Sequence, residues 1–151
     1  MRIPIQIVAD NENDKELQVV VSCRINLPHV GVIRPTFVVD TGSHISSLSY
    51  ADAKINGLLV THFPIKTSTH IGAADVNIRQ LPEVRVLLVD ATGVPHRFSL
   101  KQFCTEDPRV GSELEHRKAE TIPSILGLSF LEETGLRLHV DMKNNSAYFE
   151  L

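Results

Sequence analysis

The most informative part of the sequence is Thr36–Ser49, which reads TFVVDTGSHISSLS. An apolar run typical of a buried strand leads directly into Asp40-Thr41-Gly42 and then into small hydroxyl residues. Asp followed by Thr-Gly is a good turn in any protein, because the Asp side chain accepts backbone N–H bonds and Gly adopts positive φ. The segment therefore predicts a carboxylate at the end of a strand, and the tripeptide alone fits either an ordinary turn or a functional loop.

A second informative element lies near the C-terminus, where Ser124-Ile125-Leu126-Gly127 precedes a helical stretch from Leu128 to Thr134. Gly135 is a helix stop signal at the end of that stretch.

Together, and in this order, the two elements resemble the retroviral-type, or retropepsin-like, aspartic protease family. The catalytic loop of that family reads apolar-apolar-Asp-Thr-Gly-Ala/Ser, then Ser/Thr and an apolar residue, and an apolar-apolar-Gly signature precedes its single helix. The resemblance covers about Leu17 to Leu151. It implies an all-β, closed-barrel-like fold with one short C-terminal helix and a β-hairpin flap. It also identifies Asp40 as the catalytic aspartate and Ile125, Leu126 and Gly127 as the signature that packs against the loop.

The chemistry of this family needs two carboxylates that share one proton, and the chain contains a single Asp-Thr-Gly. Glu133-Thr134-Gly135 is not a second catalytic loop, because Glu is longer and the triplet ends the expected helix. The resemblance therefore implies a homodimer with one Asp40 from each chain. In that dimer Thr41 is expected to brace the opposite loop, and the Gly42 N–H and the Ser43 hydroxyl to donate hydrogen bonds to the carboxylate.

Between the two signatures, Thr67 to Ile78 is placed like the flap of the family, with Gly72 and Ala73 at its tip. The tip lacks the family's usual cluster of glycines, and small residues also suit the turn of an ordinary surface hairpin. Four apolar residues are candidates for the walls of a substrate pocket, although each is equally typical of plain core: Val39, Leu48, Ile71 and Ile125.

The rest of the chain is mainly β. Strands are predicted at Leu17–Leu27, Val32–Val39, Val84–Val89, Arg97–Phe103, Leu136–Val140 and Ala147–Leu151, with a strand-like N-terminus at Arg2–Val8 and a weak helix near Ala51–Ile55. The charged segment 104–121 has little periodicity and predicts a long surface loop or a frayed helix, an insertion relative to the compact viral enzymes. We expect 1–151 to form one domain, with the two strand-like ends pairing between subunits.

Composition narrows the functional classes. The chain has 151 residues, 42% apolar and 22% charged, and a net charge of -3, which excludes a disordered tail and gives no global positive field for nucleic acid. Its apolar runs are too short to cross a membrane. Two distant cysteines and an N-terminus without a signal-peptide layout indicate a reduced, cytoplasmic protein. The seven histidines form no metal-binding spacing, so we expect neither a metal nor a cofactor.

The sequence thus predicts a homodimeric aspartic endopeptidase that cleaves extended peptide or protein substrates with water activated between two Asp40 carboxylates. The alternative is a catalytically silent dimerisation or peptide-binding module with the same fold, because fold does not guarantee activity. A small-molecule β-barrel binder ranks last, since it needs no Ile125-Leu126-Gly127 element.

Overall fold

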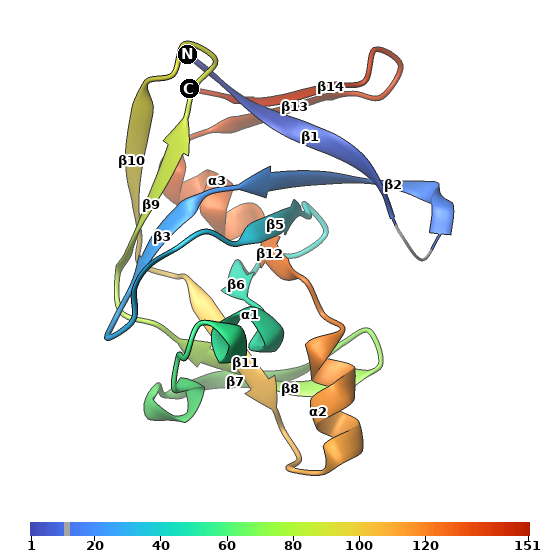
Figure 1. Ribbon diagram of the computed structural model, residues 1–151, viewed down its shortest axis with the longest axis vertical. Helices are drawn as coiled ribbons and strands as arrows, with labels where there is room; N and C mark the ends of the chain where they lie inside the picture. The colour runs from blue at the N-terminus through green and yellow to red at the C-terminus, as the bar shows by residue number, and fades with distance from the viewer. Residues whose placement is uncertain (11–12) are drawn as a thin grey trace.

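The computed structural model describes residues 1–10 and 13–151, and most of this part of the chain is β (Figure 1). Ten strands form one sheet in the order β13-β14-β1-β2-β5-β12-β6-β11-β8-β7. Their bounds are β1 Arg2–Asp10, β2 Asn13–Ser22, β5 Thr36–Val39, β6 Ser47–Leu48, β7 Ile65–Ile71, β8 Ala74–Gln80, β11 Cys104–Pro108, β12 Ser124–Leu126, β13 Arg137–Asp141 and β14 Ser146–Glu150.

A second sheet has four strands in the order β10-β9-β3-β4. The bounds of these strands are β3 Arg24–Leu27, β4 Gly31–Ile33, β9 Val84–Val89 and β10 Pro95–Leu100. The architecture is thus two open sheets rather than the closed barrel expected from the sequence. The main core, which includes the buried rings of Phe37, Phe103, Phe130 and Phe149, draws residues from both sheets.

The chain passes from one sheet to the other at Cys23 and Pro35, where the sequence predicted unbroken strands. Cys23 separates β2 from β3, and its N–H donates to the Pro35 carbonyl oxygen at 3.3 Å. Pro35 has no N–H for a strand ladder, so the segment predicted at Val32–Val39 divides into β4 and β5. The strand predicted at Arg97–Phe103 begins earlier, at Pro95, and ends at Leu100.

Three α-helices are present in the described residues, where the expected fold has one. They are α1 (Tyr50–Ile55), α2 (Glu113–Glu120) and α3 (Leu128–Thr134), with a short 3-10 turn, η1, at Val60–His62. The sequence predicted α1 and α3, and Gly135 ends α3 in the left-handed conformation with φ 71°. No helix in this part of the chain is long and apolar enough to cross a membrane.

The prediction of a surface loop at 104–121 is wrong for its first part. All five residues of β11 are buried, because this strand lies inside the ten-stranded sheet between β6 and β8. Both neighbours satisfy its backbone hydrogen bonds, so a polar sequence is accommodated in the interior. The second part forms α2, which begins at the N-cap Ser112.

The expected exchange of terminal strands between subunits is also not what the structure shows. β1 pairs with β14 on one side and with β2 on the other, all within one chain. Figure 1 shows the two termini next to each other at one corner of the molecule. The edges of the ten-stranded sheet are instead β13 and β7.

Candidate active site

Asp40 lies directly after β5 and is exposed, on a loop whose backbone is fixed at several points. Its N–H donates to the Leu126 carbonyl oxygen at 3.0 Å, which joins the loop to β12. Its side-chain Oδ1 accepts the Gly42 N–H at 2.9 Å, as the sequence predicted. This bond holds one carboxylate oxygen against the loop.

β12 passes through the loop that connects β5 to β6. It runs parallel to β5, with Leu126 opposite Val39, and antiparallel to β6, with Ile125 opposite Ser47. Immediately after β12, a Cβ atom on Gly127 would overlap the carbonyl oxygens of Ser43 and Ile45. Glycine is therefore required where this strand meets the Asp40 loop, in agreement with the role predicted for it.

The start of α3 completes the support of the loop. The N–H groups of Leu128 and Ser129 donate to the carbonyl oxygens of Ser43 and His44, at 2.8 and 2.9 Å. The first turn of a helix has free N–H groups, and here two of them bind the loop backbone. The loop is thus fixed by backbone contacts from β12 and α3.

Buried serines link the same elements, and sequence reasoning gave them no role. Ser46 Oγ accepts the Gly127 N–H at 2.9 Å and lies 2.9 Å from Ser129 Oγ. Ser124 Oγ accepts the Ser49 N–H at 2.9 Å and donates to Asp52 Oδ2 at 2.5 Å. The run of hydroxyl residues after Asp40 was the available signal, because small polar side chains suit buried contacts between closely spaced backbones.

Ser43 does not make the contact expected of it. Its hydroxyl donates to the Ile45 carbonyl oxygen at 2.9 Å, within its own loop, and not to the Asp40 carboxylate. A hydroxyl has one proton to donate, so this bond occupies its donor. In this chain Ser43 stabilises the loop conformation, and the bond to Asp40 comes from Gly42 alone among the predicted donors.

A cavity of about 280 Å³ lies beside the loop. Residues 42–45 form one side of it, with Ser47 and Ile125 next to them, and Thr69, His70, Ile71 and Ile78 of the β7–β8 hairpin form the other. Of the four candidate wall residues, Ile71 and Ile125 line this cavity, whereas Leu48 is fully buried core and Val39 packs against the core. His44, an exposed loop residue, also lines the cavity.

The hairpin predicted at Thr67–Ile78 is present, with Gly72 and Ala73 forming the turn between β7 and β8. Gly72 has φ 59°, which a glycine adopts without strain. The outer strand β7 is almost wholly exposed, and near the tip His70 Nδ1 contacts Asp75 Oδ1.

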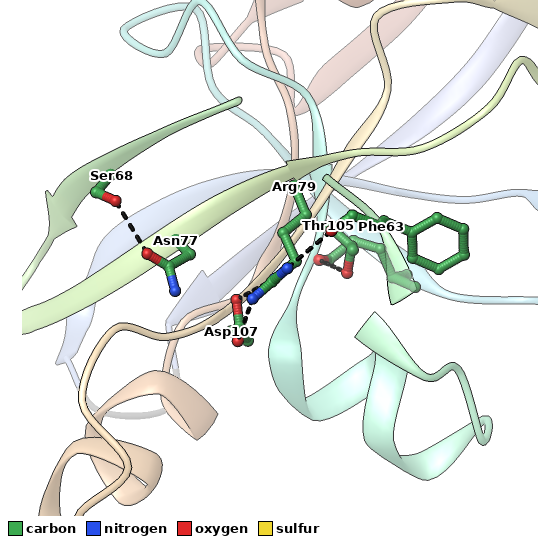
Figure 2. A network of polar contacts seen from close by, with 7 residues as sticks. Phe63, Ser68, Asn77, Arg79, Thr105 and Asp107 are labelled. Carbon is green, nitrogen blue, oxygen red and sulfur yellow. Dashed lines mark hydrogen bonds and ion pairs between the residues drawn. The ribbon is translucent and has the colours of Figure 1, made fainter. Parts of the chain in front are cut away.

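The base of the hairpin is held much more firmly than its tip. Figure 2 shows Arg79 of β8 bound to Asp107 of β11, with the Nε–Oδ1 distance 2.7 Å and the Nη2–Oδ2 distance 3.3 Å. The Arg79 Nη1 also donates to the Phe63 carbonyl oxygen at 2.7 Å. Both charged side chains are close to nine-tenths buried. Farther along the hairpin, Figure 2 shows Ser68 Oγ donating to Asn77 Oδ1 at 2.9 Å on exposed atoms.

Glu106, also missed by sequence reasoning, lies behind the cavity. Its side chain is fully buried, and Oε2 accepts the hydroxyl of the cavity residue Ser47 at 3.3 Å. Oε1 has no hydrogen-bond partner among the described residues. Burial raises the pKa of Glu106 to about 7, against the smaller lowering effects of the Ser47 hydroxyl and the Tyr50 N–H. Its place in the charged segment Cys104–Pro108 concealed it, because nothing in that pattern indicates a buried strand.

No group of three or more His, Cys, Asp or Glu side chains that could hold a metal ion occurs in the described residues. The loop exposes the Asp40 carboxylate to solvent, and its residues 42–45 line a partly apolar cavity. A carboxylate can accept a proton from water, or donate one when protonated.

No family model and no curated protein matches this chain. Among solved structures, the chain is similar to a retropepsin-like aspartic protease from Rickettsia conorii, with 15% sequence identity, a TM-score of 0.54, and coverage of 99% of this chain and 88% of that one. It is also similar to the retroviral protease-like domain of Ddi1 from Leishmania major, with 16% identity, a TM-score of 0.49, and coverage of 89% and 94%. The first of these likenesses covers nearly the whole chain, in which β5, the Asp40 loop, β12 and α3 are arranged as described above. This protein therefore has the retropepsin-like fold.

Proposed function

We propose that the protein is a homodimeric aspartic endopeptidase in which each chain contributes Asp40. One observation carries this proposal: the exposed Asp40 carboxylate is fixed by the Gly42 N–H on a doubly supported loop beside the 280 Å³ cavity. The loop support by Leu126 and Gly127 agrees with it. A rigid support of this kind lowers the cost of orienting a reactive group.

The chemistry of hydrolysis sets the need for a second chain. One carboxylate must take a proton from water while a protonated partner donates a hydrogen bond to the scissile carbonyl. The water oxygen then attacks the carbonyl carbon, and the leaving amine takes a proton as the C–N bond breaks. Each chain has one Asp-Thr-Gly, so the two-fold axis of the dimer passes between the two Asp40 loops, where Thr41 braces the opposite loop.

Substrate binds in this proposal as an extended segment between the Asp40 loop and the β7–β8 hairpin. Ile71, Ile78 and Ile125 supply apolar contacts to its side chains. The hairpin acts as a flap with Gly72 and Ala73 at its tip, and the Arg79–Asp107 ion pair anchors its base. The two cysteines, Cys23 and Cys104, are free and buried, which suits a reducing compartment such as the cytoplasm.

The dimer does not depend on exchange of β1 and β14, because both strands are already paired within the chain. Sedimentation equilibrium over a range of concentrations measures the association, and specific activity is expected to fall on dilution. Peptidase activity in a species of 16.8 kDa alone would exclude the two-chain mechanism.

Asp40→Asn tests the assignment directly. Asn keeps the size of the side chain and an oxygen for the Gly42 N–H, but it accepts no proton from water. The matched control is Glu83→Gln, an exposed carboxylate outside the site. Loss of cleavage in Asp40→Asn but not in the control, on a peptide library, supports the proposal. Equal cleavage in both variants rejects it, and no cleavage by wild type under any condition favours the silent peptide-binding module.

A further inference from the structure

The outer face of the four-stranded sheet is rich in arginine. Arg24 on β3, Arg85 on β9 and Arg97 on β10 are all exposed, and Arg34 follows directly after β4. The alternate residues of the same strands, such as Ile25 and Val86, are buried in the core. The arginines therefore share one solvent-facing side of the sheet.

The carboxylate nearest to these arginines in the chain is the exposed Glu83, which directly precedes β9 and forms no ion pair within the described residues. The four strands contain no Asp or Glu at all. None of the four side chains takes part in an ion pair within the part of the chain that the structure describes, whereas Arg2, Arg79 and Arg117 do. A concentration of unpaired positive charge on a protein with net charge -3 marks this face as different from the rest of the surface.

The register of the strands sets the spacing of the charges. Arg97 lies opposite Leu87, and Leu87 lies opposite Arg24, so the two arginines flank an apolar residue in one row across the sheet. Arg85 lies two residues from Leu87 on β9, between Ser99 and Asn26. The step between these rows is about 7 Å, the same as between alternate side chains of an extended chain.

The face is hollowed as well as charged. A cavity of about 280 Å³ is lined by the three strand arginines together with Asn26, Val32 and Leu87. Val32 is 63% exposed and contributes an apolar side chain to this cavity. Beside it, Arg24 and Arg34 line a further cavity of about 250 Å³. The cavity between the three strand arginines is thus a groove with cationic walls and a partly apolar floor, and it shares Arg24 and Leu87 with the second cavity.

We propose that this groove, the arginine face, binds an acidic polypeptide segment in an extended conformation, with carboxylates at alternate positions. The guanidinium fork matches a carboxylate with two parallel hydrogen bonds, and arginine beside exposed aliphatic side chains is typical of protein–protein contacts. Single-stranded nucleic acid is less well matched, because it requires aromatic surfaces for its bases. Of the two aromatic rings on these four strands, Phe98 packs against the core and His96 contacts Asp90.

This proposal does not depend on peptidase activity. The arginine face shares no residue with the cavity beside Asp40. A binding measurement in the Asp40→Asn background therefore tests it without cleavage of the probe, and its outcome is independent of whether the wild type is an enzyme.

The probe is a fluorescein-labelled peptide of alternating Glu and Thr, compared by anisotropy with a peptide in which Gln replaces every Glu. The test variant carries Arg24→Gln, Arg85→Gln and Arg97→Gln. The control carries Arg109→Gln, Arg137→Gln and Lys143→Gln, which removes the same charge from exposed positions elsewhere. Thermal unfolding of both variants checks that the fold is retained.

The Glu peptide is expected to bind, with an affinity that falls as salt is raised, and the Gln peptide to bind much more weakly. The test variant should lose about tenfold in affinity, since three exposed ion pairs are removed, while the control keeps its affinity. Equal losses in the two variants, or equal binding of the two peptides, would overturn the proposal. So would tighter binding of a single-stranded oligonucleotide of the same charge, which would assign the face to nucleic acid.

Discussion

The backbone of Gly127 lies so close to the carbonyl oxygen of Ser43 that no side chain fits between them. This contact joins the end of β12 to the Asp40 loop. It therefore couples the geometry of the candidate active site to the packing of the ten-stranded sheet.

Gly127→Ala should destabilise the protein strongly. A Cβ there meets two backbone carbonyl oxygens, which cannot move aside as a flexible side chain does, so we expect a loss of about 3 kcal/mol or more. Urea unfolding measures the change. Gly111→Ala is the control, because Gly111 has open space around its Cβ position and no positive φ. Equal stability of the two variants would show that the strand does not pass through the loop as described.

Ser43→Ala is expected to leave the pH dependence of peptide cleavage unchanged. The Ser43 hydroxyl is bonded to Ile45, so its removal takes no hydrogen bond from the carboxylate. It should reduce the free energy of unfolding by about 1 kcal/mol through the lost loop bond. Profiles of kcat/KM against pH for wild type and variant check the first expectation. A shift of both limbs toward higher pH would mean that the hydroxyl turns to Asp40 in the active dimer.

Glu106 should make stability depend on pH. Its pKa is raised from 4.5 to about 7 in the folded chain, so the folded state binds the proton more tightly than the unfolded state. The contribution of Glu106 to the free energy of unfolding is fully present below about pH 4.5, falls as the pH rises toward 7, and is constant above that. The difference amounts to about 3 kcal/mol at most. Glu106→Gln, which does not titrate, should flatten this part of the stability curve.

The measurement for Glu106 is the free energy of unfolding at intervals between pH 4 and 8, the range about its two pKa values. Comparing the variant with wild type cancels the contributions that the two proteins share. The exposed Glu83→Gln variant should follow the wild-type curve. Parallel curves for Glu106→Gln and wild type would mean that the carboxyl is solvated.

Arg79→Ala should loosen the base of the hairpin. Removal of the guanidinium leaves Asp107 largely buried without its partner, which costs about 3 to 5 kcal/mol for a fully buried pair and somewhat less here. Amide exchange should become faster along β8 as well as at the tip. Arg109→Ala, an exposed arginine outside the ion pairs of the described residues, should change neither stability nor exchange. Loss of exchange protection at the tip alone would show that the ion pair does not anchor the hairpin.

The parts of the structure that could be predicted from sequence are those with strong local signals. The apolar run Phe37–Val39 followed by Asp-Thr-Gly predicted the loop, and Gly135 predicted the end of α3 to the residue. The Gly72-Ala73 turn was placed by the resemblance to the flap of the family, and it has small residues between two strand-like arms. In each case the chemistry of a few neighbouring residues decides the local conformation.

The parts that could not be predicted depend on distant neighbours. β11 is polar in sequence and buried in the fold, because Arg79 neutralises Asp107 and the strands on both sides satisfy the backbone. The arginine face also required the register of three strands, since Arg24, Arg85 and Arg97 are far apart in the chain. Hydrophobic periodicity contains no information on either arrangement.

The pairing of β1 with β14 determines how the molecule responds to mechanical force. Arg2 lies opposite Glu150 and Ile5 opposite Ala147, so both strands enter their shared ladder from the same corner (Figure 1). A pull on the two ends loads the hydrogen bonds one after another, beginning at Arg2 and Glu150, rather than all together in shear. The pairs of this ladder therefore separate one at a time, under less tension than a ladder loaded in shear would need.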